Sequence, residues 1–131
     1  MREMEFIENF KKTYCSSFDK SKLFNEIYPT PKEQYPRVVI VNKNEIGCIY
    51  LHFEWNMKPN MVWLMYIKSY TKGNGSHILK LLCNEADKYG VILYLEPAVY
   101  PGSRLAYQDL VAWYRRHGFI GEATMQRAPS A

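Results

Sequence analysis

The fold of this chain is decided by the stretch Tyr70-Thr71-Lys72-Gly73-Asn74-Gly75-Ser76. It lies between an apolar run at 61–67 and an amphipathic segment at 76–89, which is the order strand, glycine loop, helix. A helix N-terminus presents unpaired N–H groups and a partial positive charge, and it therefore binds phosphate. Glycine lets the backbone approach such a ligand closely. The stretch predicts a site for a phosphate-bearing cofactor.

Two common phosphate-binding loops do not fit this stretch. The dinucleotide fingerprint needs a third glycine three residues after the second, and this chain has Ile78 there. The nucleoside-triphosphate loop ends in Gly-Lys-Ser or Gly-Lys-Thr, whereas Gly75 is followed here by Ser76 and His77. A lone Gly-x-Gly is a weak signal that also fits a plain turn, so the surrounding elements must identify the site.

Size and composition limit the possible functions. The chain has 131 residues, so we expect a single domain over 1–131 with a real core. Its formal charge of +4 suits an anionic cofactor but is too small to indicate nucleic acid by itself. Cys15, Cys48 and Cys83 lack metal-ligand spacing, so we expect reduced thiols and no metal site. Neither a signal peptide nor an apolar run of about 20 residues is visible, which favours a soluble, cytoplasmic protein.

The hydrophobic periodicity predicts a mixed α/β domain. Phe6, Ile7, Phe10 and Tyr14 recur at helical spacing, which indicates a helix at the N-terminus. Strands and helices alternate in the second half, which predicts a crossover connection between parallel strands. The further expected helices are 20–28, 76–89 and 105–117, and the expected strands are 37–41, 46–54, 61–67, 91–95, 119–123 and 124–128.

Two motifs in this order resemble the GNAT superfamily of N-acetyltransferases, in particular its short viral-type members. The family's cofactor motif, Arg/Gln-x-x-Gly-x-Gly/Ala, corresponds to 70–75, with Tyr70 in place of Arg or Gln. Its later motif, an aromatic residue and Tyr followed by x-x-x-Gly-Phe, is matched by 113–119, which reads WYRRHGF. The resemblance covers most of the chain and is strongest over 61–129.

The sequence also departs from the family before this second motif. Tyr107 stands where the family often has Asn, and Ala106 stands where many relatives carry a capping Ser. We therefore expect the start of this helix to depend on Ser103 or Asp109.

The resemblance implies a fold and a cofactor. The fold is a central, mostly antiparallel sheet with flanking helices, in which the parallel strands 61–67 and 91–95 splay apart. The cofactor is acetyl-coenzyme A, with its pyrophosphate on the glycine-loop N–H groups and its pantetheine amides on the backbone of the first of these strands. Lys72 would add charge beside a phosphate, but it fits a solvated loop lysine equally well. The implied cofactor-binding residues are Met65, Tyr66, Ile67, Lys72, Gly73, Asn74, Gly75, Ser76 and His77.

Transfer of an acyl group to an amine needs an acid and a base. Tyr114 is the candidate acid, because a phenol can protonate the leaving sulfur, although the helical pattern alone favours a core tyrosine. Glu96 ends the strand 91–95 and is the candidate base or substrate anchor, with a surface glutamate as the equal alternative. His52 and Glu54 are weaker candidates. We expect His117 to lie at a helix C-terminus, where a cation is favoured.

The resemblance therefore implies an N-acetyltransferase that acts on a primary amine, such as a protein lysine, a protein N-terminus or another amine. Aromatic residues in 14–28 and near Tyr100 favour a sizeable acceptor, for example a protein or a nucleobase, over a small polyamine. Two alternatives stay open: a non-catalytic interaction module with the same fold, and an enzyme that modifies nucleic-acid bases. The sequence leaves open whether the chain is a monomer or a homodimer, and it indicates no membrane partner.

Overall fold

The computed structural model describes residues 2–16, 37–41, 44–53, 58–69, 74–98 and 106–130. Several sequence predictions fall outside these ranges and are not tested by the structure. They are the helix at 20–28, Glu54, the loop residues 70–73, Tyr100 and Ser103.

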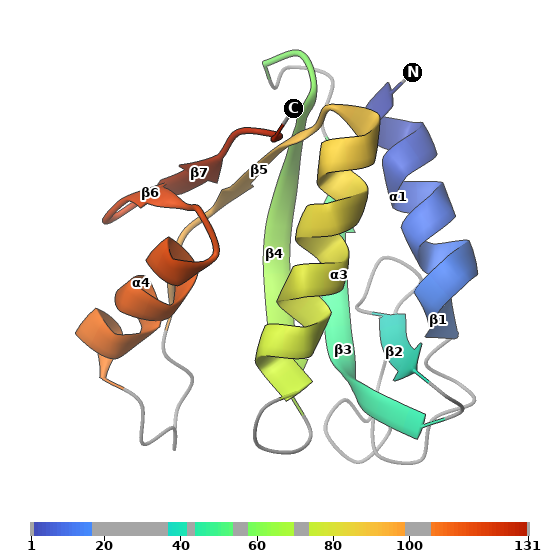
Figure 1. Cartoon of the computed structure of the whole chain (residues 1–131), viewed down its shortest axis with the longest axis horizontal. Helices are drawn as coiled ribbons and strands as arrows, with labels where there is room; N and C mark the ends of the chain where they lie inside the picture. The colour runs from blue at the N-terminus through green and yellow to red at the C-terminus, as the bar shows by residue number, and fades with distance from the viewer. Residues whose placement is uncertain are drawn as a thin grey trace.

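A mixed β-sheet forms the centre of the fold (Figure 1). Its described strands have the order β1-β2-β3-β4-β5-β7-β6, and neighbouring strands are antiparallel except β4 and β5, which are parallel. This confirms the predicted α/β class, with a mostly antiparallel sheet and one parallel pair. The strands are β1 (Cys15–Ser16), β2 (Arg37–Val41), β3 (Asn44–His52), β4 (Met61–Ser69), β5 (Ile92–Leu95), β6 (Ile120–Gly121) and β7 (Met125–Arg127).

Three described helices flank the sheet: α1 (Arg2–Tyr14), α3 (Asn74–Tyr89) and α4 (Tyr107–Arg116). Figure 1 shows α1 and α3 side by side against the sheet, with α4 next to the β5–β7 part. The Asn9 Nδ2 group of α1 donates a hydrogen bond of 3.1 Å to the buried carboxylate of Glu85 on α3, which holds the two helices together. No helix in the described ranges is both long and apolar enough to cross a membrane.

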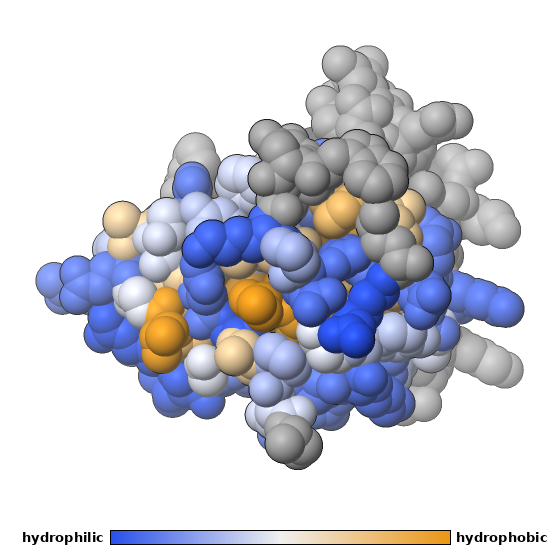
Figure 2. Space-filling view, turned by 90° about the horizontal axis from the view of Figure 1, so that it is seen from above, coloured by the Kyte–Doolittle hydropathy of each residue, from blue (hydrophilic) through white to orange (hydrophobic). Residues whose placement is uncertain are grey.

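The core lies between these helices and the sheet. Apolar side chains at helical spacing on α1 and α3 meet the alternating buried positions of β3, β4 and β5. Seen from the end of the molecule where α1 begins and α3 ends, the surface is mostly hydrophilic, with small separate apolar spots (Figure 2). The largest fully buried side chains are Phe6, Phe10, Ile78, Leu79, Leu82, Leu93, Leu95, Phe119 and Met125.

β4 and β5 pair only where both strands begin. Their register joins Met61 to Ile92, Val62 to Leu93 and Trp63 to Tyr94, whereas β4 continues as far as Ser69. Beyond this point β5 leans away from β4 toward β7, as Figure 1 shows. The two strands therefore splay apart, as the resemblance implies, and the second half of β4 is not paired with β5. We call this gap in the backbone pairing of β4 and β5 the opening.

A β-bulge accompanies this opening. In the β3–β4 register Tyr50 pairs with Tyr66 and Leu51 pairs with Leu64, so Met65 is an extra residue in β4. Its side chain is 46% exposed, although β4 is a central strand of the sheet. Bulges bend a strand and redirect its side chains, and they are common beside functional sites. Nothing in the alternation of the sequence indicated this bulge.

Several element boundaries differ from the prediction. α3 begins at Asn74 rather than at 76, and the short β1 was not predicted. α4 begins at Tyr107, and its N-cap residue Ala106 makes no side-chain capping hydrogen bond. Asp109 lies in the first turn of α4, and its backbone N–H donates to the Ala106 carbonyl; the expectation that this helix start depends on Ser103 or Asp109 stays a prediction.

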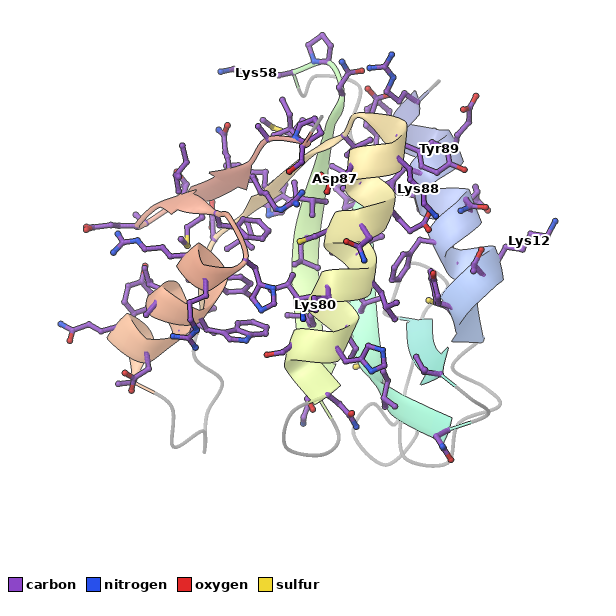
Figure 3. The ribbon with its side chains drawn as sticks, viewed as in Figure 1. Lys12, Lys58, Lys80, Asp87, Lys88 and Tyr89 are labelled. Atoms are coloured by element: carbon purple, nitrogen blue, oxygen red, sulfur yellow. The ribbon has the colours of Figure 1, made fainter. Side chains whose placement is uncertain are left out.

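An ion pair joins α3 to β7. The carboxylate of Asp87 accepts hydrogen bonds of 2.8 and 3.1 Å from the guanidinium of Arg127 and one of 2.8 Å from the Ser130 N–H. Arg127 also donates to the His117 carbonyl at 3.0 Å. Figure 3 shows Asp87 on the side of α3 that faces the β5–β7 ribbon. The contacts connect the helix that follows the glycine loop to the far part of the sheet.

This ion pair gives the protein a pH-dependent stability. The hydrogen bonds from Arg127, followed by the one from Ser130, lower the pKa of Asp87 below its usual value. A carboxylate with a lowered pKa in the folded state stabilises the protein above its unfolded pKa of about 4, and this contribution disappears as the pH falls through the folded pKa.

We expect Asp87→Asn to reduce the free energy of unfolding by about 1–2 kcal/mol at neutral pH. At a pH below the lowered pKa of Asp87 the difference between variant and wild type should shrink, because both side chains are then uncharged. Urea titrations at the two pH values measure this, with Glu122→Gln as the control, since that side chain is 82% exposed. An equal loss at both pH values would mean that Asp87 acts only through its shape.

Candidate functional site

The first turn of α3 has the properties of an anion-binding helix start. It contains no acidic residue, and its residues Asn74, Gly75 and Ser76 are only half-buried, while His77 is exposed. The backbone N–H groups of a first helical turn have no partner within the helix, and the helix dipole places partial positive charge there. The part of the predicted cofactor loop that the structure describes therefore fits a phosphate group.

Trp113 connects this turn to α4. Its indole Nε1–H donates a hydrogen bond of 2.8 Å to the Ser76 Oγ. A hydroxyl that accepts a hydrogen bond still has its own proton to donate, so the Ser76 O–H remains able to bind an anion at the helix start. A methyl group on Gly75 would lie 3.6 Å from the Trp113 ring and 3.6 Å from the Ser69 Cβ, which is ordinary contact distance. Alanine therefore fits at Gly75.

Tyr114 lies next to Trp113 and is buried in the core, with 6% of its surface exposed. Its ring centroid is 4.8 Å from that of Trp113 and 5.5 Å from that of Phe119. The candidate acid is therefore held by aromatic packing on both sides. Through Trp113, the structure brings Tyr114 and the first turn of α3 into one group of contacts.

The predicted pantetheine-binding strand is the half of β4 that runs along the opening. Met65 is the exposed bulge residue, Ile67 is buried, and the side chain of Tyr66 lies outside the described residues. One side of this half strand is paired with β3, and the β5 register does not extend along the other. An extended amide chain that enters the opening would therefore meet β4 backbone rather than β5.

Glu96 is exposed and immediately follows β5. Its Oε1 accepts a hydrogen bond of 3.4 Å from the Tyr94 hydroxyl. Partial burial and the negative charge of Glu96 raise the pKa of Tyr94, so this hydroxyl stays protonated and can donate. Glu96 thus contacts Tyr94 on the β5 side of the opening, and it belongs to a different group of contacts from that of Trp113.

The histidines and arginines near the site have different surroundings. His117 is the C-cap residue of α4, but burial, and then the charges of Lys80, Arg116 and Arg127, lower its pKa. The prediction that His117 lies at a helix C-terminus is confirmed, while desolvation and the three nearby cations disfavour its charged form. Arg115 binds the Gly121 carbonyl at 3.1 Å and the Glu122 carboxylate at 3.4 Å, which makes it a link to the β6–β7 turn.

The cysteines are free, and Cys48 and Cys83 are buried. Burial raises the pKa of Cys83 to about 11, so this thiol is protonated and unreactive at neutral pH. Among the residues that the structure describes, no group of three or more His, Cys, Asp or Glu side chains is placed to hold a metal ion.

A hollow of about 210 Å³ lies elsewhere, between α1 and β3. It is away from the first turn of α3 and from Tyr114, and its described lining is mainly apolar. Of the predicted site residues that the structure describes, only the weak candidate His52 touches it. The described lining residues are Met4, Ile7, Glu8, Phe10, Lys11, Ile49, Tyr50, Leu51, His52 and Phe53.

Sequence reasoning missed two features of the site. The Trp113–Ser76 hydrogen bond joins residues 37 positions apart, and no local pattern could predict it. Trp63 and Tyr94 were predicted only as parts of strands, although their alternation with buried valine and leucine places both on the opposite face of the sheet from the core.

Comparison with known proteins reveals only a distant likeness. No protein-family model matches the chain, and no curated protein matches its sequence. Among solved structures, the chain is similar to N-acetylglutamate synthase from Neisseria gonorrhoeae complexed with coenzyme A and N-acetyl-glutamate, with 12% identity and a TM-score of 0.42. The match covers 98% of this chain and 32% of the other, so this chain spans about a third of the length of that protein.

Proposed function

We propose that this chain is an acyl-coenzyme A-dependent N-acyltransferase that transfers an acetyl group from acetyl-coenzyme A to a primary amine. The observation that carries the proposal is the position of the first turn of α3. This helix start contains no acidic residue and follows the glycine loop, after the half of β4 that is not paired with β5. Trp113 joins it to α4, the helix that carries Tyr114. The resemblance of 70–76 and 113–119 to the GNAT motifs supports the same reading.

The residues present fit the anionic cofactor. The backbone N–H groups of Gly73, Asn74, Gly75 and Ser76 would hold the pyrophosphate, and Lys72 and His77 stand next to it in the sequence. The backbone of 65–67 would bind the amides of the pantetheine arm on the side of β4 from which β5 has departed. When bound, acetyl-coenzyme A supplies the thioester whose carbonyl carbon the amine attacks.

Two side chains would move the protons. As the C–N bond forms and the C–S bond breaks, Glu96 takes the proton that the amine nitrogen loses. Tyr114 donates its hydroxyl proton to the departing sulfur, so the products are an amide and a free thiol. The proton held by Glu96 then returns to Tyr114 through water, which restores both groups for the next cycle.

A non-catalytic module is the second candidate. Tyr107, at the position where the family often has Asn, donates a hydrogen bond of 3.0 Å from its hydroxyl to the Glu122 carbonyl. This contact gives the residue a structural role, and it favours a chain that keeps the fold without the family's full set of polar groups. Such a module would bind a partner but would not catalyse acetyl transfer, so it would produce no free coenzyme A from acetyl-coenzyme A.

Calorimetric titration with coenzyme A tests the proposal, with two variants at one position. We expect micromolar affinity for the wild type and for Gly75→Ala, since a methyl group fits there. Gly75→Glu should abolish binding, because a carboxylate repels phosphate from the helix start.

Two outcomes would contradict this account. The first is that the folded wild type does not bind coenzyme A, which would remove the cofactor site and favour the interaction module. The second is equal affinity of the Gly75→Ala and Gly75→Glu variants, which would place the cofactor elsewhere on the molecule.

A further inference from the structure

A row of side chains crosses the sheet at the point where β4 and β5 begin to separate. The register places His52 opposite Trp63, Trp63 opposite Tyr94, and Tyr94 opposite Gln126. Cross-strand partners in register lie on the same face of a sheet. The row, which we call the cross-sheet row, therefore extends over β3, β4, β5 and β7.

The cross-sheet row lies on the face opposite the core. The residues on either side of Trp63 are the buried Val62 and Leu64, and those on either side of Tyr94 are the buried Leu93 and Leu95. Because side chains alternate between the two faces of a strand, Trp63 and Tyr94 point away from α3. Both are half-buried, and so is His52, whereas Gln126 is exposed.

The centre of the row combines aromatic rings with one carboxylate. The ring centroids of Trp63 and Tyr94 are 5.2 Å apart at an interplanar angle of 79°, so the edge of one ring meets the face of the other. The Tyr94 hydroxyl donates to Glu96 Oε1 at 3.4 Å, which keeps this carboxylate beside the two rings. Trp63 and Tyr94 are also the last pair of the β4–β5 register, so the group stands at the edge of the opening.

We propose that Trp63, Tyr94 and Glu96 form the acceptor site and bind one alkylammonium group, that of a lysine side chain in a protein substrate. An ammonium is attracted to the faces of Trp and Tyr rings, and a nearby carboxylate strengthens its binding. The methylene stem of lysine can lie along the apolar part of the rings. This inference rests on the proposed function and specifies its acceptor.

The chemistry of the row separates lysine from other acceptors. Among the residues that the structure describes, the centre of the row has one carboxylate, that of Glu96, which neutralises one cation, whereas a polyamine would need several acidic groups. The amino group of a nucleobase carries no positive charge, so Glu96 and the ring faces would give it no such electrostatic attraction. Arginine would bind to the same rings, but its guanidinium stays protonated and cannot attack a thioester. The bound lysine ammonium first loses one proton to water, and the neutral amine then attacks the thioester and gives its second proton to Glu96.

The test separates acceptor binding from acyl transfer. The probe is Nα-acetyl-lysine amide with a trimethylated side-chain nitrogen, which keeps the positive charge but cannot be acylated. It is titrated into the folded protein saturated with coenzyme A, and NMR follows the indole N–H signal of Trp63, which is assigned from its absence in Trp63→Phe. We expect a saturable shift of this signal.

Three variants locate the binding. Glu96→Gln and Trp63→Leu should each weaken binding of the probe by about fivefold. Because Trp63→Leu lacks the Trp63 indole, the titrations of all three variants are monitored by the backbone amide signals of Tyr94 and Leu95. Glu8→Gln should not change the affinity, because this exposed carboxylate pairs with Lys11 on α1, on the core side of the sheet. Since Glu96 is exposed, its variant is expected to fold even if Trp63→Leu does not.

Three results would overturn the inference. The first is unchanged affinity in Glu96→Gln, and the second is no shift with the probe. The third is a shift of Trp63 with cytidine in place of the probe, which would indicate a nucleobase acceptor. Coenzyme A binding is measured in the same samples, so its loss would overturn the proposed function, whereas its retention without probe binding would overturn only the acceptor site.

Discussion

Replacement of Tyr114 by Phe is expected to lower kcat by about a hundredfold while the affinity for coenzyme A stays the same. The change removes the hydroxyl that would protonate the departing sulfur and keeps the ring that packs between Trp113 and Phe119. The measurement is thiol release from acetyl-coenzyme A, with lysine-containing peptides as acceptors. Calorimetry gives the affinity for coenzyme A in parallel.

Tyr107→Phe is the matched control for this prediction. It removes a tyrosine hydroxyl from the same helix, but one that binds the exposed Glu122 carbonyl. We expect it to keep nearly full kcat. Thermal unfolding of both variants would show whether a loss of activity comes from loss of the fold. If folded Tyr114→Phe has the kcat of the wild type, Tyr114 is only a core residue.

The second large effect concerns stability and Gly47 of β3. An added Cβ there would overlap the Lys68 carbonyl oxygen of β4 and come within 2.6 Å of the Ile78 Cδ1 of α3. The obstacle on one side is strand backbone, which cannot rotate away as a side chain can. We expect Gly47→Ala to reduce the free energy of unfolding by about 3 kcal/mol, at the upper end for overpacked sites.

Urea titration measures this loss, and Gly75→Ala provides the comparison. A Cβ on Gly75 makes only ordinary contacts, and alanine is a better helix former than glycine, so that variant should be as stable as the wild type or slightly more stable. A Gly47→Ala protein within about 0.5 kcal/mol of the wild type would show that β3, β4 and α3 can move apart at this point.

The main strands could be predicted because burial leaves a pattern in the sequence. β2 coincides with the expected strand at 37–41, since its β-branched run has no polar interruption. β4 extends further than expected, to Ser69, because Lys68 and Ser69 continue the pairing with Cys48 and Gly47 although they are not apolar. Apolar patterns thus mark the buried part of a strand and miss an end that is held by backbone hydrogen bonds.

β1 could not be predicted for a related reason. It consists of Cys15 and Ser16 alone, directly after α1, and it exists because these residues pair with Val38 and Val39. Two residues are too few for alternation to appear. Such a strand is specified by its partner, which is a tertiary contact that local propensity does not encode.

In the candidate site, too, some features could be predicted from local sequence and others could not. The glycines, the helix that follows them and the burial of Tyr114 could be inferred from local patterns and from the resemblance. The Trp113–Ser76 hydrogen bond, the Met65 bulge and the cross-sheet row depend on how distant segments meet, so the structure was needed to find them. The pKa of His117 likewise depends on Lys80 and Arg127, which lie on other elements.

The central claim is that coenzyme A binds at the first turn of α3 and along the open half of β4. The most direct test is an NMR titration of the nitrogen-labelled protein with coenzyme A, followed residue by residue. The account predicts the largest shifts at the backbone amides of Asn74, Gly75, Ser76 and Met65 and at the indole of Trp113. Shifts confined to the hollow between α1 and β3, or no saturable shift, would contradict it.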